Sequence, residues 1–143
     1  MLFRSQNGIA ITLHQLAMLA QAQGEMEEAG RLYGESLEIK KRLGNQSGIA
    51  ITLHELGRLA QAQGELEEAR RLYSESLEIK KRLGNQNGIA STLGQLGVLV
   101  AEEGDRAEGM RLLQESLSIF ERLKSPNAEI VRRNLKRLEG ESS

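Results

Sequence analysis

The sequence predicts an all-α solenoid of three helix-turn-helix units, followed by a helix that caps the C-terminal end. Three observations support this prediction: the chain repeats itself at a fixed period, apolar residues recur at helical spacing inside each repeat, and glycines separate the predicted helices. One helix pair cannot bury its own apolar face, whereas stacked pairs share a continuous core.

The internal repeat has a period of 40 residues. Residues 8–47 align with residues 48–87 at 33 identical positions of 40, and residues 88–127 keep 19 of 40 against the second unit. We therefore expect one domain over residues 1–143, built from units 8–47, 48–87 and 88–127.

The first helix of a unit is clearest in the second repeat. Ile49, Leu53, Leu56 and Ala60 fall at i, i+4, i+7 and i+11, which places them on one face of a helix. Gly64 follows this run, and glycine suits the left-handed position that closes a helix.

A second helix then runs to the end of the unit. Gly84 closes this helix, and Asn85 can cap the N-terminus of the next one. The residues that trace one face of this second helix are Leu66, Ala69, Tyr73, Ser76, Leu77 and Leu83.

Charged residues agree with these boundaries. Acidic residues begin the second helix of the unit, and the basic residues 80–82 end it, as the helix dipole favours. We interpret these runs as a solvated face, with Glu67–Arg71 and Glu27–Arg31 forming i, i+4 ion pairs.

Several glycines lie inside predicted helices. Gly109 stands where the second unit has Ala69, and it should weaken its helix by about 1 kcal/mol. Gly30 and Gly34 should act in the same way, although their spacing also suits close approach of another helix.

The C-terminal segment predicts one more helix. Ser125 can cap it and Pro126 suits its first turn, so we expect a capping helix over residues 126–139. Its apolar face is expected to comprise Ile130, Val131, Leu135 and Leu138, and its polar face to meet solvent. The alternative reading of this polar face is a basic nucleic-acid stripe, but it lacks interleaved aromatic residues.

The N-terminus differs from the C-terminus. Residues 3–6 align with residues 43–46, where a helix ends, so we expect a preceding helix to end there too. No polar helix caps the first unit, which indicates either a piece of a longer array or a face that meets another chain. Near-identical units also favour helix exchange between two copies, so a homodimer through the uncapped N-terminal repeat is expected as one alternative.

The middle unit resembles the tetratricopeptide repeat. Its 40-residue period is similar to that of the longer form found in kinesin light chains and in adaptors with Leu-Gly-Asn repeats. The signature positions are Leu53, Leu56, Gly57, Ala60, Gly64, Ala69, Tyr73, Ser76 and Leu77. Leu53, Ala60 and Ser76 depart from it, since Trp, Tyr and Ala are common there. The resemblance implies a right-handed superhelix whose concave groove is lined by the first helix of each unit.

The same resemblance implies which residues would contact a partner. The groove positions carried onto this chain are Ile11, His14, Met18, Gln21, Ile51, His54, Arg58, Gln61, Ser91, Gly94, Val98 and Glu102. Arg58 is the only basic residue among them, which argues against the Lys, Asn and Arg clamp that some chaperone adaptors use for peptide carboxylates.

Chemistry-bearing motifs do not emerge from the sequence. The chain has no cysteine, and His54-Glu55 lacks the second histidine that a helical zinc-protease motif requires, because position 58 is Arg. His14 and His54 should lie about 10 Å apart on neighbouring helices, too far to share one metal. We therefore expect no enzyme activity, no cofactor and no metal.

Composition narrows the partners. Nineteen basic and twenty acidic residues give a net charge of −1, which does not indicate nucleic acid or an anionic membrane. No apolar run approaches the ~18 residues of a membrane span, and a cytoplasmic location is expected. The sequence predicts a non-catalytic module that binds a protein or peptide in its groove. The alternative is a self-assembling or spacer repeat, domain-swapped or part of a larger multidomain signalling protein.

Overall fold

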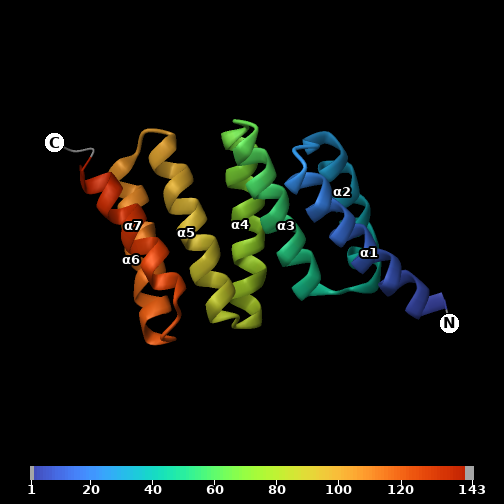
Figure 1. Ribbon diagram of the computed structural model, residues 1–143. Helices are drawn as coiled ribbons and strands as arrows, with labels where there is room; N and C mark the ends of the chain where they lie inside the picture. The colour runs from blue at the N-terminus through green and yellow to red at the C-terminus, as the bar shows by residue number, and fades with distance from the viewer. Residues whose placement is uncertain (1, 141–143) are drawn as a thin grey trace. The chain divides into compact units, whose positions relative to one another are not determined.

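The chain folds into successive α-helices. The computed structural model describes the backbone of residues 2–140 and the side chains of residues 6–140. Within that range it contains seven helices and no strand: α1 Leu2–Ala22, α2 Met26–Leu43, α3 Gln46–Ala62, α4 Leu66–Leu83, α5 Gln86–Glu102, α6 Arg106–Arg122 and α7 Asn127–Gly140. Helices α1 and α2, and likewise α5 and α6, pack as antiparallel pairs joined by tight turns (Figure 1), and α3 packs against α2 while α7 packs against α6. The predicted all-α class and the array of helix pairs are confirmed.

Two compact units divide the chain. The first, Met1–Ile79, contains α1, α2, α3 and most of α4. The second, Lys80–Ser143, contains the last turn of α4 together with α5, α6 and α7.

The turns recur at a spacing of 20 residues and share one geometry. Positive φ angles occur at glycines 24, 44, 64, 84 and 104, and at Lys124 in the sixth turn. At Gly44, with φ 66°, the amide donates to Lys41 O at 3.1 Å, and the Asn45 amide donates to Lys40 O at 3.0 Å. This pattern satisfies the last carbonyls of α2. Asn45 then caps α3, because its side chain accepts from the Gly48 amide at 2.9 Å.

A serine ties the second helix of each pair to the first. In the first compact unit, Ser36 Oγ donates to Ala10 O at 2.9 Å, and Ser76 Oγ donates to Ala50 O at 2.6 Å. In the second unit Ser116 Oγ donates to Ala90 O at 2.7 Å. All three serines are fully buried, so the hydroxyl that departs from the family signature is satisfied by the partner helix.

Glycines inside helices have different surroundings. A Cβ on Gly109 would lie 2.7 Å from Gly97 O and 2.9 Å from the Ala101 side chain, so α5 and α6 need glycine at this crossing. Gly34 has open space around it, and a Cβ on Gly30 would make only an ordinary 3.5 Å contact with Leu59. The spacing of Gly30 and Gly34 therefore does not mark a close helix crossing in the first unit.

The exposed ion pairs differ from those predicted. Arg31 bonds to Glu28 at 2.7 Å and to Glu35 at 2.6 Å, and Arg71 pairs with Glu68 and Glu75 in the same way. The predicted Glu27–Arg31 and Glu67–Arg71 pairs are wrong. The guanidinium instead bridges one carboxylate on the preceding turn and one on the following turn, using several of its donors at once.

The helix at the N-terminus also differs from the prediction. A helix end was expected within residues 3–6, but α1 runs through them from Leu2. The aligned turn of the next repeat uses Gly44 and Asn45, whereas Arg4 and Ser5 occupy these positions here. Without glycine, the left-handed turn is unfavourable and the helix continues.

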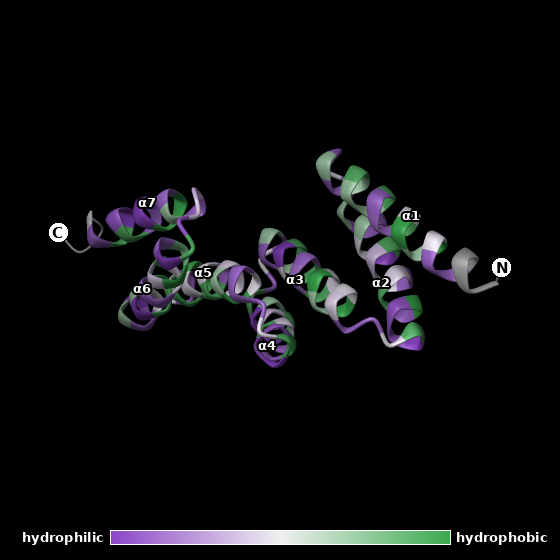
Figure 2. Cartoon of the chain, turned by 90° about the horizontal axis from the view of Figure 1, so that it is seen from below, coloured by the Kyte–Doolittle hydropathy of each residue, from purple (hydrophilic) through white to green (hydrophobic). Residues whose placement is uncertain are grey.

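Helix α7 covers one side of α6. It begins one residue after the predicted start, with Ser125 Oγ accepting from the Asn127 amide at 3.1 Å. Val131, Leu135 and Leu138 are buried against α6 residues that include Leu113 and Phe120. The prediction for Ile130 is wrong, because it is 52% exposed on a different side of the helix. Most of α7 is otherwise hydrophilic (Figure 2).

Candidate functional site

The predicted groove positions of the first repeat lie along α1. Ile11 is 48% and Met18 is 52% exposed, while His14 and Gln21 are partly buried. Tyr33, which is fully buried on α2, holds the two polar residues. Its hydroxyl donates to Gln21 Oε1 at 2.9 Å, and its ring meets the His14 imidazole edge-on at 5.2 Å between centroids. This face of α1 therefore pairs exposed apolar side chains with polar side chains of fixed orientation.

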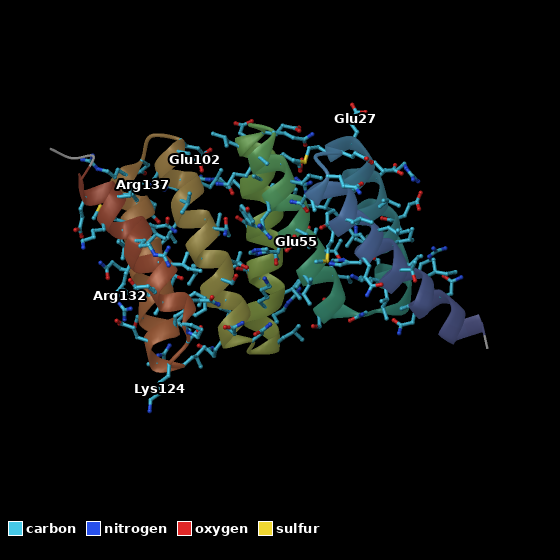
Figure 3. The ribbon with its side chains drawn as sticks, viewed as in Figure 1. Glu27, Glu55, Glu102, Lys124, Arg132 and Arg137 are labelled. Carbon is cyan, nitrogen blue, oxygen red and sulfur yellow. The ribbon has the colours of Figure 1, made fainter. Side chains whose placement is uncertain are left out.

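The predicted positions of the second repeat lie along α3. Ile51 is 46% exposed. Arg58 is also exposed and forms an ion pair with Glu55, with 3.4 Å between Nη1 and Oε2; Glu55 is labelled in Figure 3. Gln61 Oε1 accepts from the Tyr73 hydroxyl at 2.8 Å. His54 is different, since it is only 8% exposed and packs edge-on against Tyr73.

A buried lysine connects α1 to α3 beneath these positions. Lys40, on α2, is 8% exposed, and its Nζ donates to Thr52 Oγ1 at 2.8 Å and lies 3.3 Å from His14 Nδ1. Thr52 Oγ1 in turn donates to Gly48 O at 2.9 Å. In the second unit Lys80 is 5% exposed and donates to Thr92 Oγ1 at 2.8 Å.

The solvated-face interpretation is therefore wrong for the lysine that begins each basic run. Lys40 lies seven residues after Tyr33 and four after Ser36, so it shares their buried helix face. The residues that follow it, Lys41 and Arg42, are exposed as expected.

Burial shifts the pKa values of His14, Lys40 and Tyr33. Burial lowers the pKa of His14 first, and the nearby Lys40 charge lowers it further. Burial also lowers the pKa of Lys40 and raises the pKa of Tyr33 to about 12. A neutral His14 ring with an unprotonated Nδ1 can accept from the Lys40 ammonium, which explains their close approach.

In the second unit, the predicted groove positions line two hollows between α5 and α7. Ser91 and Gly94 face Ile130 and Asn134 across a hollow of about 160 Å³. Val98 and Glu102 lie with Arg137 and Leu138 around another of about 400 Å³, and Figure 3 shows Glu102 and Arg137 near the same end of the two helices. The sequence interpretation missed the α7 residues, although Ile130, Asn134 and Arg137 follow one another at i, i+4 and i+7.

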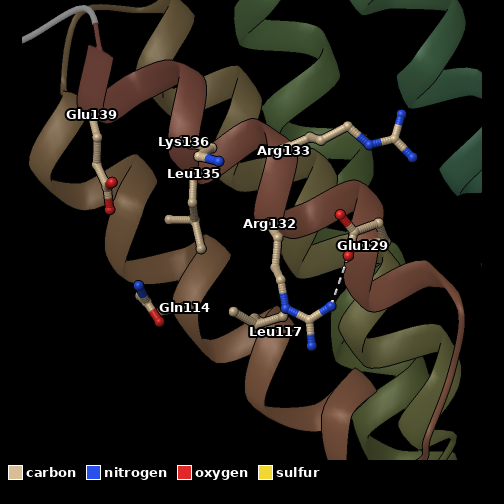
Figure 4. Close-up of a pocket in the computed structure, with 8 residues that line it drawn as sticks. All are labelled: Gln114, Leu117, Glu129, Arg132, Arg133, Leu135, Lys136 and Glu139. Carbon is tan, nitrogen blue, oxygen red and sulfur yellow. Dashed lines mark hydrogen bonds and ion pairs between the residues drawn. The ribbon is translucent and has the colours of Figure 1, made fainter.

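A further hollow of about 390 Å³ lies between α6 and α7 (Figure 4). Its cations include Arg132, which bonds to Glu129 at 3.0 Å and to Glu121 at 2.9 Å. Arg133, Lys136 and Glu139 also line it. Because two carboxylates lie among the three cations of this hollow and Arg132 is already paired, this surface does not favour a polyanion.

No group of three or more His, Asp or Glu side chains within the described part of the chain is arranged to hold a metal ion. Over residues 2–140, none of the helices combines the length and hydropathy needed to cross a bilayer.

Solved structures share this fold at low sequence identity. BtubC from P. vanneervenii matches 93% of this chain with a TM-score of 0.70 and 20% identity, and RapI matches 94% with 0.89 and 17%. The chain spans 64% of the first and 50% of the second. A putative kinesin light chain from Podospora anserina with nearly identical repeats matches 90% of this chain and 64% of its own length, with a TM-score of 0.71 and 22% identity.

Sequence comparison identifies the family. The search of curated proteins finds no match to this chain. The tetratricopeptide repeat profile matches residues 8–82, more than half of the 143 residues, and thereby confirms the resemblance seen in the repeat signature. The chain belongs to the tetratricopeptide repeat family, whose domains are generally protein–protein interaction modules.

Proposed function

We propose that this chain is a non-catalytic adaptor that binds a peptide or protein segment on the groove face of α1 and α3. The observation that carries the proposal is the exposure of Ile11, Met18 and Ile51 beside polar groups held by Tyr33 and Tyr73. Exposed aliphatic side chains bordered by oriented polar groups are typical of contact surfaces.

The composition of this face favours one kind of ligand. Its exposed cation, Arg58, already pairs with Glu55, so a terminal carboxylate is not the favoured anchor. Apolar positions next to glutamine amides instead suit an extended or helical segment with apolar side chains and free backbone or side-chain polar groups. Within the second compact unit, Ser91, Val98 and Glu102 are proposed as its own partner-binding positions, and residues 1–143 are proposed to form a single repeat domain. We also propose a cytoplasmic location, which the absence of cysteine supports.

A displayed peptide library tests the groove directly. Peptides selected on the wild-type chain would be re-tested on Ile51→Glu and on Leu19→Glu. Both substitutions replace an exposed aliphatic residue by the same charge, but Leu19 lies off the groove face. Binding lost in Ile51→Glu and retained in Leu19→Glu supports the proposal, provided that both variants keep the wild-type circular dichroism and melting temperature. Failure to enrich any peptide sensitive to Ile51→Glu contradicts it.

Self-assembly through the first repeat is the second candidate. It is favoured by the exposed aliphatic residues of α1 that lie away from the groove, Ile9, Leu16 and Leu19. Two copies pairing through them would form a homodimer. Light scattering over a range of concentrations tests this candidate: a dimer that Leu19→Glu converts to monomer supports it, and a monomer at every concentration rejects it.

A further inference from the structure

One side of α1 is apolar and uncovered. Ile9 is 44%, Leu16 is 46% and Leu19 is 54% exposed, and Thr12 between them is exposed as well. These four residues, the α1 flank, fall at i, i+3, i+7 and i+10, so they form one stripe along the helix. The groove positions Ile11 and Met18 lie on a different side of α1.

The next repeat contains the same stripe in a covered form. Ile49 is 7%, Thr52 is 0% and Leu59 is 3% exposed, although each occupies the position of Ile9, Thr12 or Leu19 one repeat later. The side chains are identical in the two repeats. Their different exposure therefore comes from what lies against them.

Helix α2 is what covers the stripe on α3. Leu59 belongs to one buried cluster with Leu32 and Tyr33, and its Cδ2 lies 3.5 Å from the Cβ position of Gly30. At the other end of the contact, Lys40 Nζ donates to Thr52 Oγ1 at 2.8 Å. The helix that fits this stripe is thus amphipathic, with a small residue, apolar residues and a lysine along one face.

We propose that the α1 flank is a second binding surface, which takes an amphipathic helix of the α2 type from another polypeptide. The partner helix lies on α1 as α2 lies on α3. Its apolar face covers Ile9, Leu16 and Leu19, and its lysine donates to Thr12 Oγ1. The site is separate from the groove, and its occupation leaves Ile11 and Met18 exposed.

The polarity of the flank favours this occupant over a second copy of α1. Between Gln6 and Ala22 the only ionisable residue of α1 is His14, which lies off the flank. In the α2–α3 contact the Thr52 hydroxyl donates to Gly48 O and accepts from Lys40. Two α1 flanks packed together contain no such cation, so the acceptor side of both Thr12 hydroxyls would face apolar side chains. An α2-type helix supplies the lysine.

The test uses a fluorescent synthetic peptide with the sequence of residues 25–44, titrated with the whole chain and followed by anisotropy. Saturable binding by a monomeric chain is expected. Leu19→Glu should weaken it at least tenfold, and Ile11→Glu, the same charge placed on the groove side of the same helix, should leave it unchanged. A peptide with Lys40→Met should bind several-fold more weakly to the wild-type chain, because methionine has no ammonium group to donate to Thr12 Oγ1.

A second measurement removes the requirement that a short peptide folds alone. The same segment joined ahead of Met1 through a flexible Gly/Ser linker acts at high effective concentration. It should raise the melting temperature, and Leu19→Glu in the fusion should abolish the rise while Ile11→Glu retains it.

Three results would overturn the proposal. The first is no peptide binding together with no rise in melting temperature of the fusion. The second is equal binding to the wild type and Leu19→Glu. The third is a wild-type dimer that Leu19→Glu converts to monomer, since a second copy then occupies the flank. None of these results depends on the groove, whose own ligand responds to Ile51→Glu.

Discussion

Lys40 shows how this fold accommodates a buried charge. Its ammonium has no carboxylate partner among residues 6–140; its hydrogen-bond partners there are a threonine hydroxyl and a histidine nitrogen. Neutral acceptors carry a smaller desolvation cost than a buried carboxylate. The neutral state of His14 is therefore part of the arrangement, because a protonated ring would place two cations within 3.3 Å.

Stability should depend on pH through His14. Its pKa is lowered in the folded chain, whereas an unfolded histidine titrates near about 6.5. Between these values the unfolded chain binds more protons, so the free energy of unfolding falls as pH drops below about 6.5. Replacing His14 by Gln keeps an acceptor for Lys40 and removes the titration. The loss of stability between about pH 7.5 and about pH 5.5, measured by urea unfolding, should be smaller in His14→Gln than in the wild type. An equal loss in both proteins would refute this role.

Some of these residues could be assigned from the sequence, and others could not. The repeat signature pointed to His14 and Gln21 as groove positions, and this assignment stays a prediction. It gave no sign that Tyr33 holds both, because the partners are 12 and 19 residues apart and meet only after the helices pair. The prediction that Lys40 is solvated was wrong because lysines at a helix end usually are solvated. Only the packing of the helices shows which lysine is buried.

Glycines inside the helices have opposite effects on stability, and two alanine substitutions distinguish them. Gly34→Ala should stabilise the chain by about 0.5–1 kcal/mol, because alanine favours the helix and the site is open. Gly109→Ala should destabilise it by about 1–3 kcal/mol, because the added methyl group meets the Gly97 carbonyl. Thermal and urea unfolding of the two variants against wild type give the signs. Stabilisation by Gly109→Ala would show that the α5–α6 crossing is looser than described.

The sixth turn is the exception among the helix junctions. Lys124 has a φ of 55°, a conformation that costs a residue with a Cβ about 1–2 kcal/mol. Glycine removes that cost and regains flexibility in the unfolded chain, so Lys124→Gly should stabilise by up to about 1 kcal/mol. The matched control is Lys41→Gly, an exposed position inside α2, where the same change should destabilise. Melting temperatures that fall in both variants would contradict this assignment of strain.

The helices themselves were largely predictable. Apolar spacing and the glycines at 64 and 84 located the second repeat's helices and turns, because local propensity and packing agree there. Residues 3–6 misled the prediction, since alignment to a turn does not make a turn when its glycine is missing. The close crossing at Gly97 and Gly109 was equally invisible, because a sequence does not show the distance between two backbones.

The second compact unit depends on α7. Ala128, Val131, Leu135 and Leu138 are buried in a cluster that includes Phe120 on α6. Truncation after Lys124 would expose Phe120 and its neighbours, and apolar surface in contact with water favours association. The truncated chain should melt at a lower temperature and form larger species in light scattering. An unchanged melting temperature would show that α7 is dispensable.

At the scale of the molecule, the sequence identified the architecture and left the ligand open. Repetition of one 40-residue pattern requires stacked helix pairs, whatever each pair contacts. A binding partner leaves no such trace. The exposures of Ile11, Met18 and Ile51 describe a surface, and the chemistry that completes it belongs to another molecule.

The left-handed residues at positions 24, 44, 64, 84, 104 and 124 also bear on how such a chain can change in length. A single inserted residue inside a helix rotates everything after it by about 100° and takes the buried face out of register. Duplication or deletion of 40 residues, at any point in a repeat, joins equivalent positions of two repeats and therefore keeps every turn at its place in the pattern. Arrays of this kind should therefore lengthen and shorten by whole helix pairs. Near-identical neighbouring repeats, such as the first two in this chain, make such duplication or deletion easy.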